Sequence, residues 1–96
     1  MTRETHVEKY LRQRVRDAGG LCIKLSPASY VGIPDRLILL PKGVTVLPEV
    51  KKPKGGVIAR MQFKWRDDLL ALGHNHRFLL RHDDVDEMLN TFMGDR

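Results

Sequence analysis

The sequence of 96 residues predicts one α/β domain, a mixed β-sheet flanked by helices in the order α-β-β-β-α-β-α. Apolar residues recur at helical spacing in three separate segments, which is typical of amphipathic helices. Short runs rich in Val, Ile and Leu lie between these segments and are typical of strands. With 42% hydrophobic residues, residues 1–96 can form one compact core and leave no room for a second domain.

The first predicted helix covers residues 5–18. Val7, Leu11 and Val15 follow helical spacing, and Gly19-Gly20 is typical of a helix end. Residues 21–25 then form a short predicted strand. The only cysteine of the chain, Cys22, lies in this strand, so the chain has no internal disulfide and we expect the thiol to fill the core.

The next two strands are expected to pair as a hairpin. Arg36-Leu37-Ile38-Leu39-Leu40 is apolar at almost every position, which predicts a central strand covered on both faces. Pro41-Lys42-Gly43 forms a turn, and residues 44–51 form the partner strand. Pro48 lies inside this strand, so either its missing N–H faces an unpaired side or the strand bulges there.

The C-terminal part predicts a helix, a strand and a helix. Apolar residues return to helical spacing from about Ile58 and stop at Gly73, and residues 77–81 form a short strand. Asp83 or Asp84 is expected to cap the last helix. The apolar stripe of this helix consists of Val85, Met88, Leu89, Phe92 and Met93.

The charge distribution favours a polyanionic partner. The chain has 17 Lys and Arg against 12 Asp and Glu, and its basic excess lies in residues 1–66. Lys and Arg near phosphates release condensed counterions, so nucleic acid is the expected partner. No apolar stretch approaches the ~20 residues of a membrane span, which predicts a cytoplasmic protein without a membrane partner.

Glu49 and Lys51 are two residues apart on a predicted strand, so their side chains share one face. Asp35 enters the central strand, and the hairpin can return it to Glu49. Two carboxylates, the Val50 carbonyl and waters suit a hard cation such as Mg²⁺. Such a site fits phosphodiester hydrolysis, in which Lys51 would orient or deprotonate the attacking water.

These residues also carry a family resemblance. Pro34-Asp35 followed by Glu49-Val50-Lys51 resembles the PD-(D/E)xK pattern of nucleases, and nearly the whole chain resembles a stand-alone VRR-NUC domain of bacterial viruses. The other elements that follow the order of this family are Glu8, Gly19-Gly20, Gly32-Ile33-Pro34-Asp35-Arg36 and Gln62. Pro48 departs from the family pattern, in which a β-former is more usual.

The resemblance implies a divalent-metal-dependent DNA endonuclease with a PD-(D/E)xK nuclease-like fold, using Mg²⁺ or, in its place, Mn²⁺. It implies Asp35, Glu49 and the Val50 carbonyl as metal ligands, and Glu8 as a ligand or a water-mediated contributor. It also implies that Lys51 orients the water and that Gln62 is a polar support of the catalytic site. Stand-alone relatives further imply a homodimer that acts on branched DNA such as four-way junctions. The side chains expected to contact DNA are Lys24, Arg36, Lys52 and Lys54.

Each residue also has a structural interpretation. Thr5-x-x-Glu8 is a capping box, which would turn Glu8 away from a metal. Asp35 alone would be a turn acid, Glu49 and Lys51 a surface ion pair, and Gln62 an exposed helical residue. The remaining side chains with a structural alternative are Lys24, Lys52 and Lys54 as solvated lysines and Trp65 as a core residue.

Two other functions stay open from the sequence. One is a nuclease acting on flapped or nicked duplex DNA. The other is a nucleic-acid-binding module that has kept the fold and lost catalysis. His74-Asn75-His76 does not match the dispersed residues of an HNH site, and no histidine is assigned a catalytic role.

Overall fold

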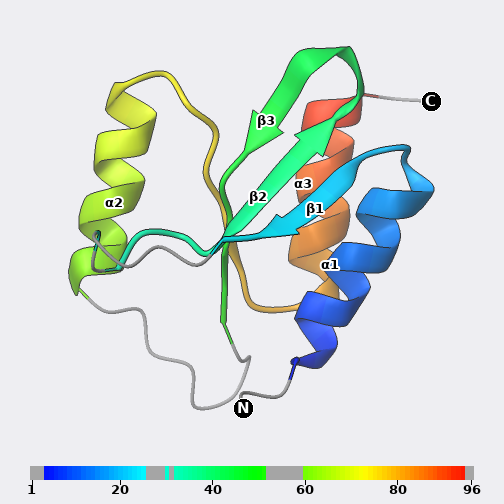
Figure 1. Ribbon diagram of the computed structural model, residues 1–96, viewed down its shortest axis with the longest axis horizontal. Helices are drawn as coiled ribbons and strands as arrows, with labels where there is room; N and C mark the ends of the chain where they lie inside the picture. Colours follow the sequence, from blue (N-terminus) through cyan, green and yellow to red (C-terminus); the bar gives the residue numbers. More distant parts are fainter. Residues whose placement is uncertain (1–3, 26–29, 31, 52–59, 95–96) are drawn as a thin grey trace.

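The computed structural model describes residues 4–25, 30, 32–51 and 60–94. Figure 1 shows the order of the elements along the chain. The helices are α1 (His6–Asp17), α2 (Arg60–Ala71) and α3 (His82–Met93), and a 3₁₀ turn, η1, covers Pro41–Gly43. The strands are β1 (Leu21–Lys24), β2 (Arg36–Leu40), β3 (Val44–Val46), β4 (Glu49–Val50) and β5 (Phe78–Leu79).

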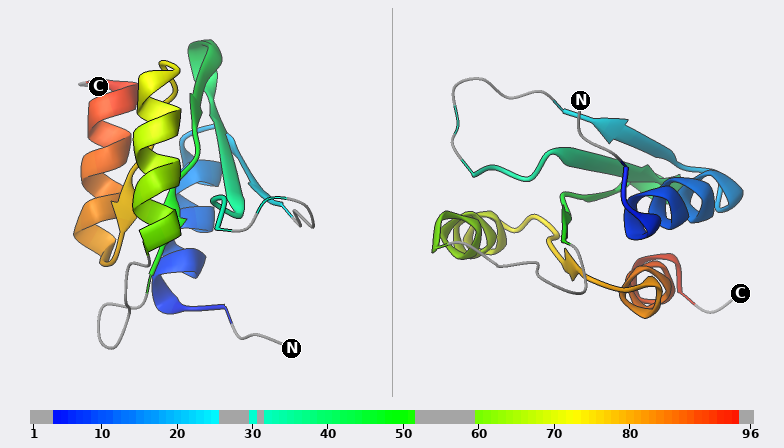
Figure 2. Two further views of the ribbon diagram at one scale, coloured as in Figure 1. Left: turned by 90° about the vertical axis from the view of Figure 1, so that its left-hand side faces the viewer. Right: turned by 90° about the horizontal axis from the view of Figure 1, so that it is seen from below.

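The strands form two small sheets. β1, β2 and β3 are antiparallel neighbours with β2 in the centre, as predicted, and β4 pairs with β5 in parallel. A single bridge between Val46 and Asn75 joins the two sheets. In both views of Figure 2 the helices lie on one side of the three-stranded sheet.

Helix α1 packs its apolar stripe between that sheet and α3. Val7, Leu11 and Val15 are buried, as their spacing predicted. The helix ends at Ala18, and Gly19 then adopts a positive φ of 85°. A Cβ on Gly20 would lie 2.5 Å from the carbonyl oxygen of Leu39, so the chain after α1 passes directly against β2.

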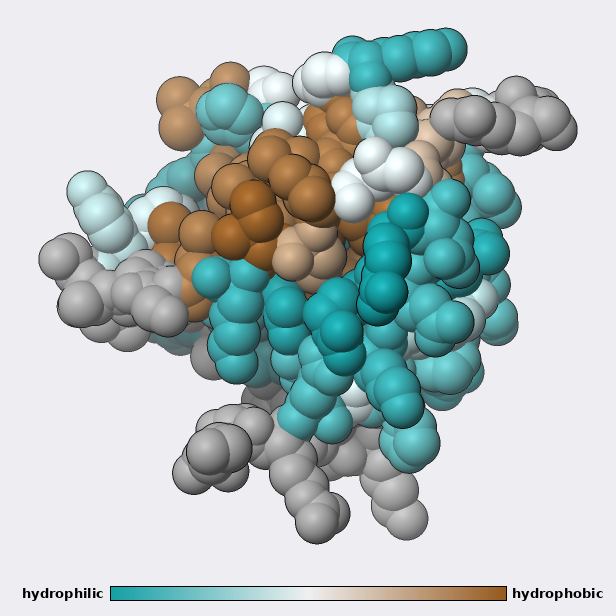
Figure 3. Space-filling model, turned by 45° about the vertical axis from the view of Figure 1, so that its right-hand side comes forward, coloured by the Kyte–Doolittle hydropathy of each residue, from teal (hydrophilic) through white to brown (hydrophobic). Residues whose placement is uncertain are grey.

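The expectation that β2 is covered on both faces is wrong for the described residues. Arg36, Ile38 and Leu40 are buried under the helices, whereas the alternate residues of β2 are only partly buried. The helices cover one face, so aliphatic side chains remain on the other. This open face consists of Leu21, Ile23, Leu37 and Leu39, which the antiparallel register pairs across β1 and β2. Figure 3 shows hydrophobic side chains gathered across one side of the molecule.

The predicted strand 44–51 is split in two, which adds a strand to the predicted order. β3 pairs with β2, and beyond Val46 the chain leaves β2 to run beside β5. The N–H groups of Leu47, Glu49 and Lys51 donate to the carbonyls of Asn75, Arg77 and Leu79 at 2.9–3.0 Å. Alternate residues of a strand point their backbone groups to opposite sides, so the missing N–H of Pro48 faces away from β5.

Helix α2 stands beside the sheets, and of its residues only Leu69 is buried. Trp65, expected in the core, lies instead edge-on to Tyr30, with ring centroids 5.9 Å apart. Gly32 lies against this helix, because a Cβ there would come within 2.8 Å of the Met61 Cβ. The first residues of this predicted helix, 58 and 59, lie outside the described residues.

Helix α3 begins at His82, earlier than a cap at Asp83 or Asp84 would place it. Asp84 still satisfies the helix start, because its Oδ2 accepts hydrogen bonds from the N–H groups of Leu80 and Arg81 at 2.8 and 3.0 Å. Val85, Met88 and Leu89 are buried as predicted. No helix within the described residues is long and apolar enough to cross a membrane.

Candidate functional site

The fork between β2 and β4, where the two strands diverge, brings together the residues singled out in the sequence. Asp35 immediately precedes β2, Glu49 begins β4 and Lys51 follows it. The charges of Lys51 and Asp35 both act on the Glu49 carboxyl group, and Gln62 of α2 shares a hydrogen bond with it. Residues separated by up to 27 positions therefore meet at one carboxylate.

Backbone hydrogen bonds fix both sides of the fork. The N–H of Leu25 donates to the carbonyl of Asp35 at 2.7 Å, which ties the entry of β2 to the end of β1. On the other side, Glu49 and Lys51 both direct their N–H groups at β5. The carbonyl of Val50, the residue between them, must then face away from β5, while its side chain packs against the core.

The Glu49 side chain is a buried acid. The residue is only 8% exposed, and its β5 partner Phe78 packs edge-on against Phe63 of α2 at a centroid distance of 5.4 Å. Burial raises the pKa of Glu49 to about 7; Lys51 opposes this rise, Asp35 adds to it, and the Gln62 hydrogen bond lowers it. Glu49 therefore exchanges its proton near neutral pH.

The donor set at the fork fits a divalent cation. A desolvated carboxylate beside a second acid is unfavourable when both are ionised, and a cation between them relieves that cost. Asp35 and Glu49 supply two such oxygen ligands. Within the part of the chain that the structure describes, however, no three His, Cys, Asp or Glu side chains gather as a metal-binding group.

Glu8, the third acid implied as a ligand, is engaged elsewhere. Its Oε1 accepts from the backbone N–H and the hydroxyl of Thr5 at 3.4 and 3.3 Å, and the Thr5 hydroxyl accepts from the N–H of Glu8 at 3.1 Å. The capping box is therefore present. The Oε2 of Glu8 accepts from Arg36 at 3.0 Å, so both carboxylate oxygens have protein partners.

Arg36 does not have the exposed position expected of a DNA contact. It is 5% exposed, and its Nη2 lies 3.0 Å from Glu8 and 3.5 Å from Glu4. The sequence does predict this burial. Side chains two residues apart on a strand share a face, so Arg36 lies with Ile38 and Leu40 on the face that the helices cover. A charged residue in phase with two core residues points to an internal partner rather than to DNA.

The other expected DNA contacts are only partly described. Lys24, at the end of β1, is exposed and accessible to a phosphate. Lys52 and Lys54 lie outside the described residues.

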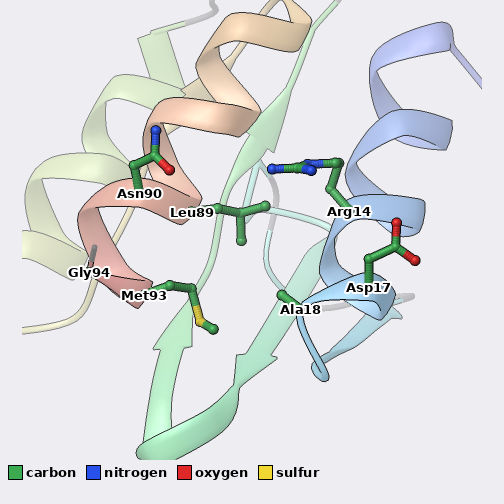
Figure 4. Close-up of a pocket in the computed structure, with 7 residues that line it drawn as sticks. All are labelled: Arg14, Asp17, Ala18, Leu89, Asn90, Met93 and Gly94. Carbon is green, nitrogen blue, oxygen red and sulfur yellow. The ribbon is translucent and has the colours of Figure 1, made fainter. Parts of the chain in front are cut away.

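A separate hollow lies where α1 and α3 end, and Figure 4 shows Arg14 and Asn90 facing each other across it. Its volume is about 370 Å³. None of the residues predicted for the site lines it. The full lining consists of Arg14, Asp17, Ala18, Leu89, Asn90, Met93 and Gly94.

Comparison with known proteins finds similar proteins over most of the chain, although no protein-family model matches it. The protein named "Putative nuclease p44" of Acyrthosiphon pisum secondary endosymbiont phage 1 is 38% identical over 74 residues, covering 77% of this chain and 78% of that protein. A solved structure described as a VRR_NUC domain has a TM-score of 0.84 at 32% identity, covering 96% of this chain and 99% of that one. The likeness thus extends over both strands of the fork and the helices around it.

Proposed function

Because the chain belongs to the VRR-NUC family of nucleases, we propose that it is a divalent-metal-dependent DNA endonuclease with a PD-(D/E)xK site at the fork between β2 and β4. The observation that carries this proposal is the buried Glu49 carboxyl, which meets Asp35, Lys51 and Gln62. A nuclease needs a cation-binding acid pair and a proton-handling group beside the scissile phosphate, and the fork supplies both.

Asp35, Glu49 and the Val50 carbonyl would hold Mg²⁺, and Mn²⁺ would serve in its place. When bound there, such a cation would supply positive charge for the phosphoryl oxygens and would lower the pKa of the attacking water. Gln62 holds the Glu49 carboxyl by a hydrogen bond, and Lys51 shares the strand face of Glu49. The role proposed for the Lys51 ammonium is to orient the water that attacks the phosphorus.

The proposed substrate is branched DNA, cut by a homodimer. The open face supports the dimer, because it is apolar and its Leu21 and Ile23 are 61% and 37% exposed. None of its four residues carries a charge, so the same face of a second copy can meet it without like-charge contact. Two sites related by a twofold axis match the two symmetry-related strands of a four-way junction.

Cleavage of matched four-way junction, flap, nicked duplex and linear duplex substrates by the wild type in Mg²⁺ and in Mn²⁺ tests the function. We expect metal-dependent cutting with a preference for the junction. Lys51→Ala should abolish cutting, whereas Lys9→Ala, on the exposed side of α1, should retain it. Equal activity of Lys51→Ala and the wild type, or none in either, would reject the catalytic assignment. Equal cutting of junction and linear duplex would reject the branched substrate alone.

A further inference from the structure

We propose that Arg36 is a positioning residue of this nuclease site: its buried guanidinium ties the start of α1 to the start of β2 and so sets Asp35 opposite Glu49. This inference rests on the proposed metal-dependent function. It assigns to Arg36 a role inside the protein in place of the DNA contact expected from the sequence.

The guanidinium reaches three different segments. Its Nη2 donates to Glu8 of α1 at 3.0 Å and lies 3.5 Å from Glu4, which precedes the helix. Its Nη1 donates to the Cys22 sulfur of β1 at 3.9 Å. One side chain thus holds together the N-terminal end of α1, β1 and β2.

This anchor lies directly beside a catalytic acid. Asp35 precedes Arg36 in the chain, and its carbonyl is already fixed by the Leu25 N–H at 2.7 Å. The Arg36 charge also interacts with Asp35 and with Glu8. Asp35 is bonded to Arg36 through one peptide, and its charge acts on the Glu49 carboxyl, so a guanidinium that fixes Arg36 also restricts where Asp35 lies relative to Glu49.

Stability alone does not account for a buried arginine at this position. Replacing a buried ion pair by apolar residues of similar volume is often neutral or stabilising, because the desolvation of both charges opposes their attraction. Ile38 and Leu40, on the same face of β2, show that an apolar side chain suits this layer. In addition, the Arg36 Nε has no hydrogen-bond partner among the described residues. An apolar side chain would lack the directional hydrogen bonds that the guanidinium donates to Glu8 and to the Cys22 sulfur.

Mn²⁺ affinity, measured by isothermal titration calorimetry on the folded protein, tests the role without requiring catalysis. We expect Arg36→Met to weaken Mn²⁺ binding about 10- to 100-fold, the usual effect of removing a residue that orients metal ligands. Arg36→Lys, which keeps the charge but lacks the planar fork, should weaken it less. Arg14→Met is the matched control, because it removes an ion pair of α1 to Asp86, away from the fork, and should bind Mn²⁺ as the wild type does.

Circular dichroism at the titration temperature shows which variants are folded. If Arg36→Met is unfolded, Arg36→Lys carries the test, since it keeps a charged hydrogen-bond donor but lacks the planar guanidinium. A folded Arg36 variant that binds Mn²⁺ as tightly as the wild type would overturn the inference. Mn²⁺ binding by Asp35→Asn shows whether the inference about Arg36 alone is wrong or the proposed metal site itself is wrong. If the wild type does not bind Mn²⁺, or if Asp35→Asn binds it equally well, the proposed metal site is wrong.

Discussion

At the scale of single residues, Glu49 shows a conflict between folding and the proposed function. Folding favours its neutral form, because burial removes water from the carboxylate and raises its pKa to about 7. Cation binding needs the ionised form. At neutral pH the ionised form of Glu49 therefore lowers the free energy of unfolding, and a bound cation would offset this loss.

Glu49→Gln should make the metal-free protein more stable at alkaline pH. The folded-state pKa is raised above the unfolded value of 4.5, so the stability that the neutral carboxyl contributes is complete below pH 4.5 and is lost as pH rises through 7. At pH 8 we expect the variant to exceed the wild type by about 1–3 kcal/mol. Urea unfolding at pH 5 and pH 8 measures this difference.

The comparison between variant and wild type isolates Glu49 from other titrating groups. Burial lowers the pKa of His76 to about 4, so His76 reduces stability as pH falls below about 6.5. This pH dependence is opposite to that of Glu49 and is the same in both proteins. Mg²⁺ should stabilise the wild type at pH 8 and leave Glu49→Gln unaffected. A stability difference between the two proteins that is the same at pH 5 and pH 8 would contradict the buried-acid explanation.

At the scale of elements, the two sides of the fork are positioned by how neighbouring segments pack. Pro48 occurs where the chain changes partner from β2 to β5, and its lack of an N–H costs nothing on the side away from β5. At the other side, α1 is followed by Gly20, which lets the chain pass against the backbone of β2. Gly20 therefore permits a close backbone approach, whereas Pro48 leaves no N–H unpaired where the strand changes partner.

Gly20→Ala should destabilise the fold through a steric clash. The added methyl group would lie 2.5 Å from the Leu39 carbonyl oxygen and 3.1 Å from the side chains of Val15 and Leu40. We expect a loss of about 2–4 kcal/mol, measured by thermal or urea unfolding.

Gly19→Ala is the matched control for this prediction. Gly19 has a φ of +85° and, within 4 Å of an added Cβ, only the Pro41 Cγ at 3.7 Å. Its substitution should cost about 1–2 kcal/mol from backbone strain alone. If Gly20→Ala costs no more than Gly19→Ala, α1 and β2 do not approach as closely as the structure indicates.

At the scale of the whole molecule, the one-sided arrangement of helices is the feature that bears on assembly. All described helices lie on the same side of the three-stranded sheet, and the open face remains apolar. A domain of this size buries a modest fraction of its surface by itself. Association through the open face would complete a second core layer.

If the proposed dimer forms through the open face, Leu21→Lys should convert it to a monomer that remains folded. Leu21 is 61% exposed, so a lysine costs the single chain little, whereas in the dimer it would bury a charge at an apolar contact. Analytical ultracentrifugation measures the change. Leu72→Lys is the control, because Leu72 is 74% exposed beyond the end of α2 and off the open face.

The same variant connects assembly to cleavage. A monomeric Leu21→Lys protein should nick single strands of a junction and lose paired incision of both. A monomeric wild type, or a Leu21→Lys protein that remains dimeric, would show that the open face is not the interface.

The sequence by itself determined the features that depend on local periodicity. Val7, Leu11 and Val15 predicted α1, the apolar run of β2 predicted a central strand, and the spacing of Glu49 and Lys51 predicted a shared face. These predictions hold because a helix repeats every 3.6 residues and a strand every two, whatever the rest of the chain does. The resemblance to the VRR-NUC family, recognised from Pro34-Asp35 and Glu49-Val50-Lys51, is confirmed by the two similar proteins.

Only the tertiary structure decided the features that depend on burial and on distant partners. The strand 44–51 divides because β5, far along the chain, offers its edge beyond Val46. Arg36 turns inward because Glu8 meets it under the sheet, and the same Glu8 carboxylate takes part in the capping box with Thr5. The pKa of Glu49 rises because separate segments exclude water around one carboxylate, and the spacing of residues along a chain does not specify how much water is excluded.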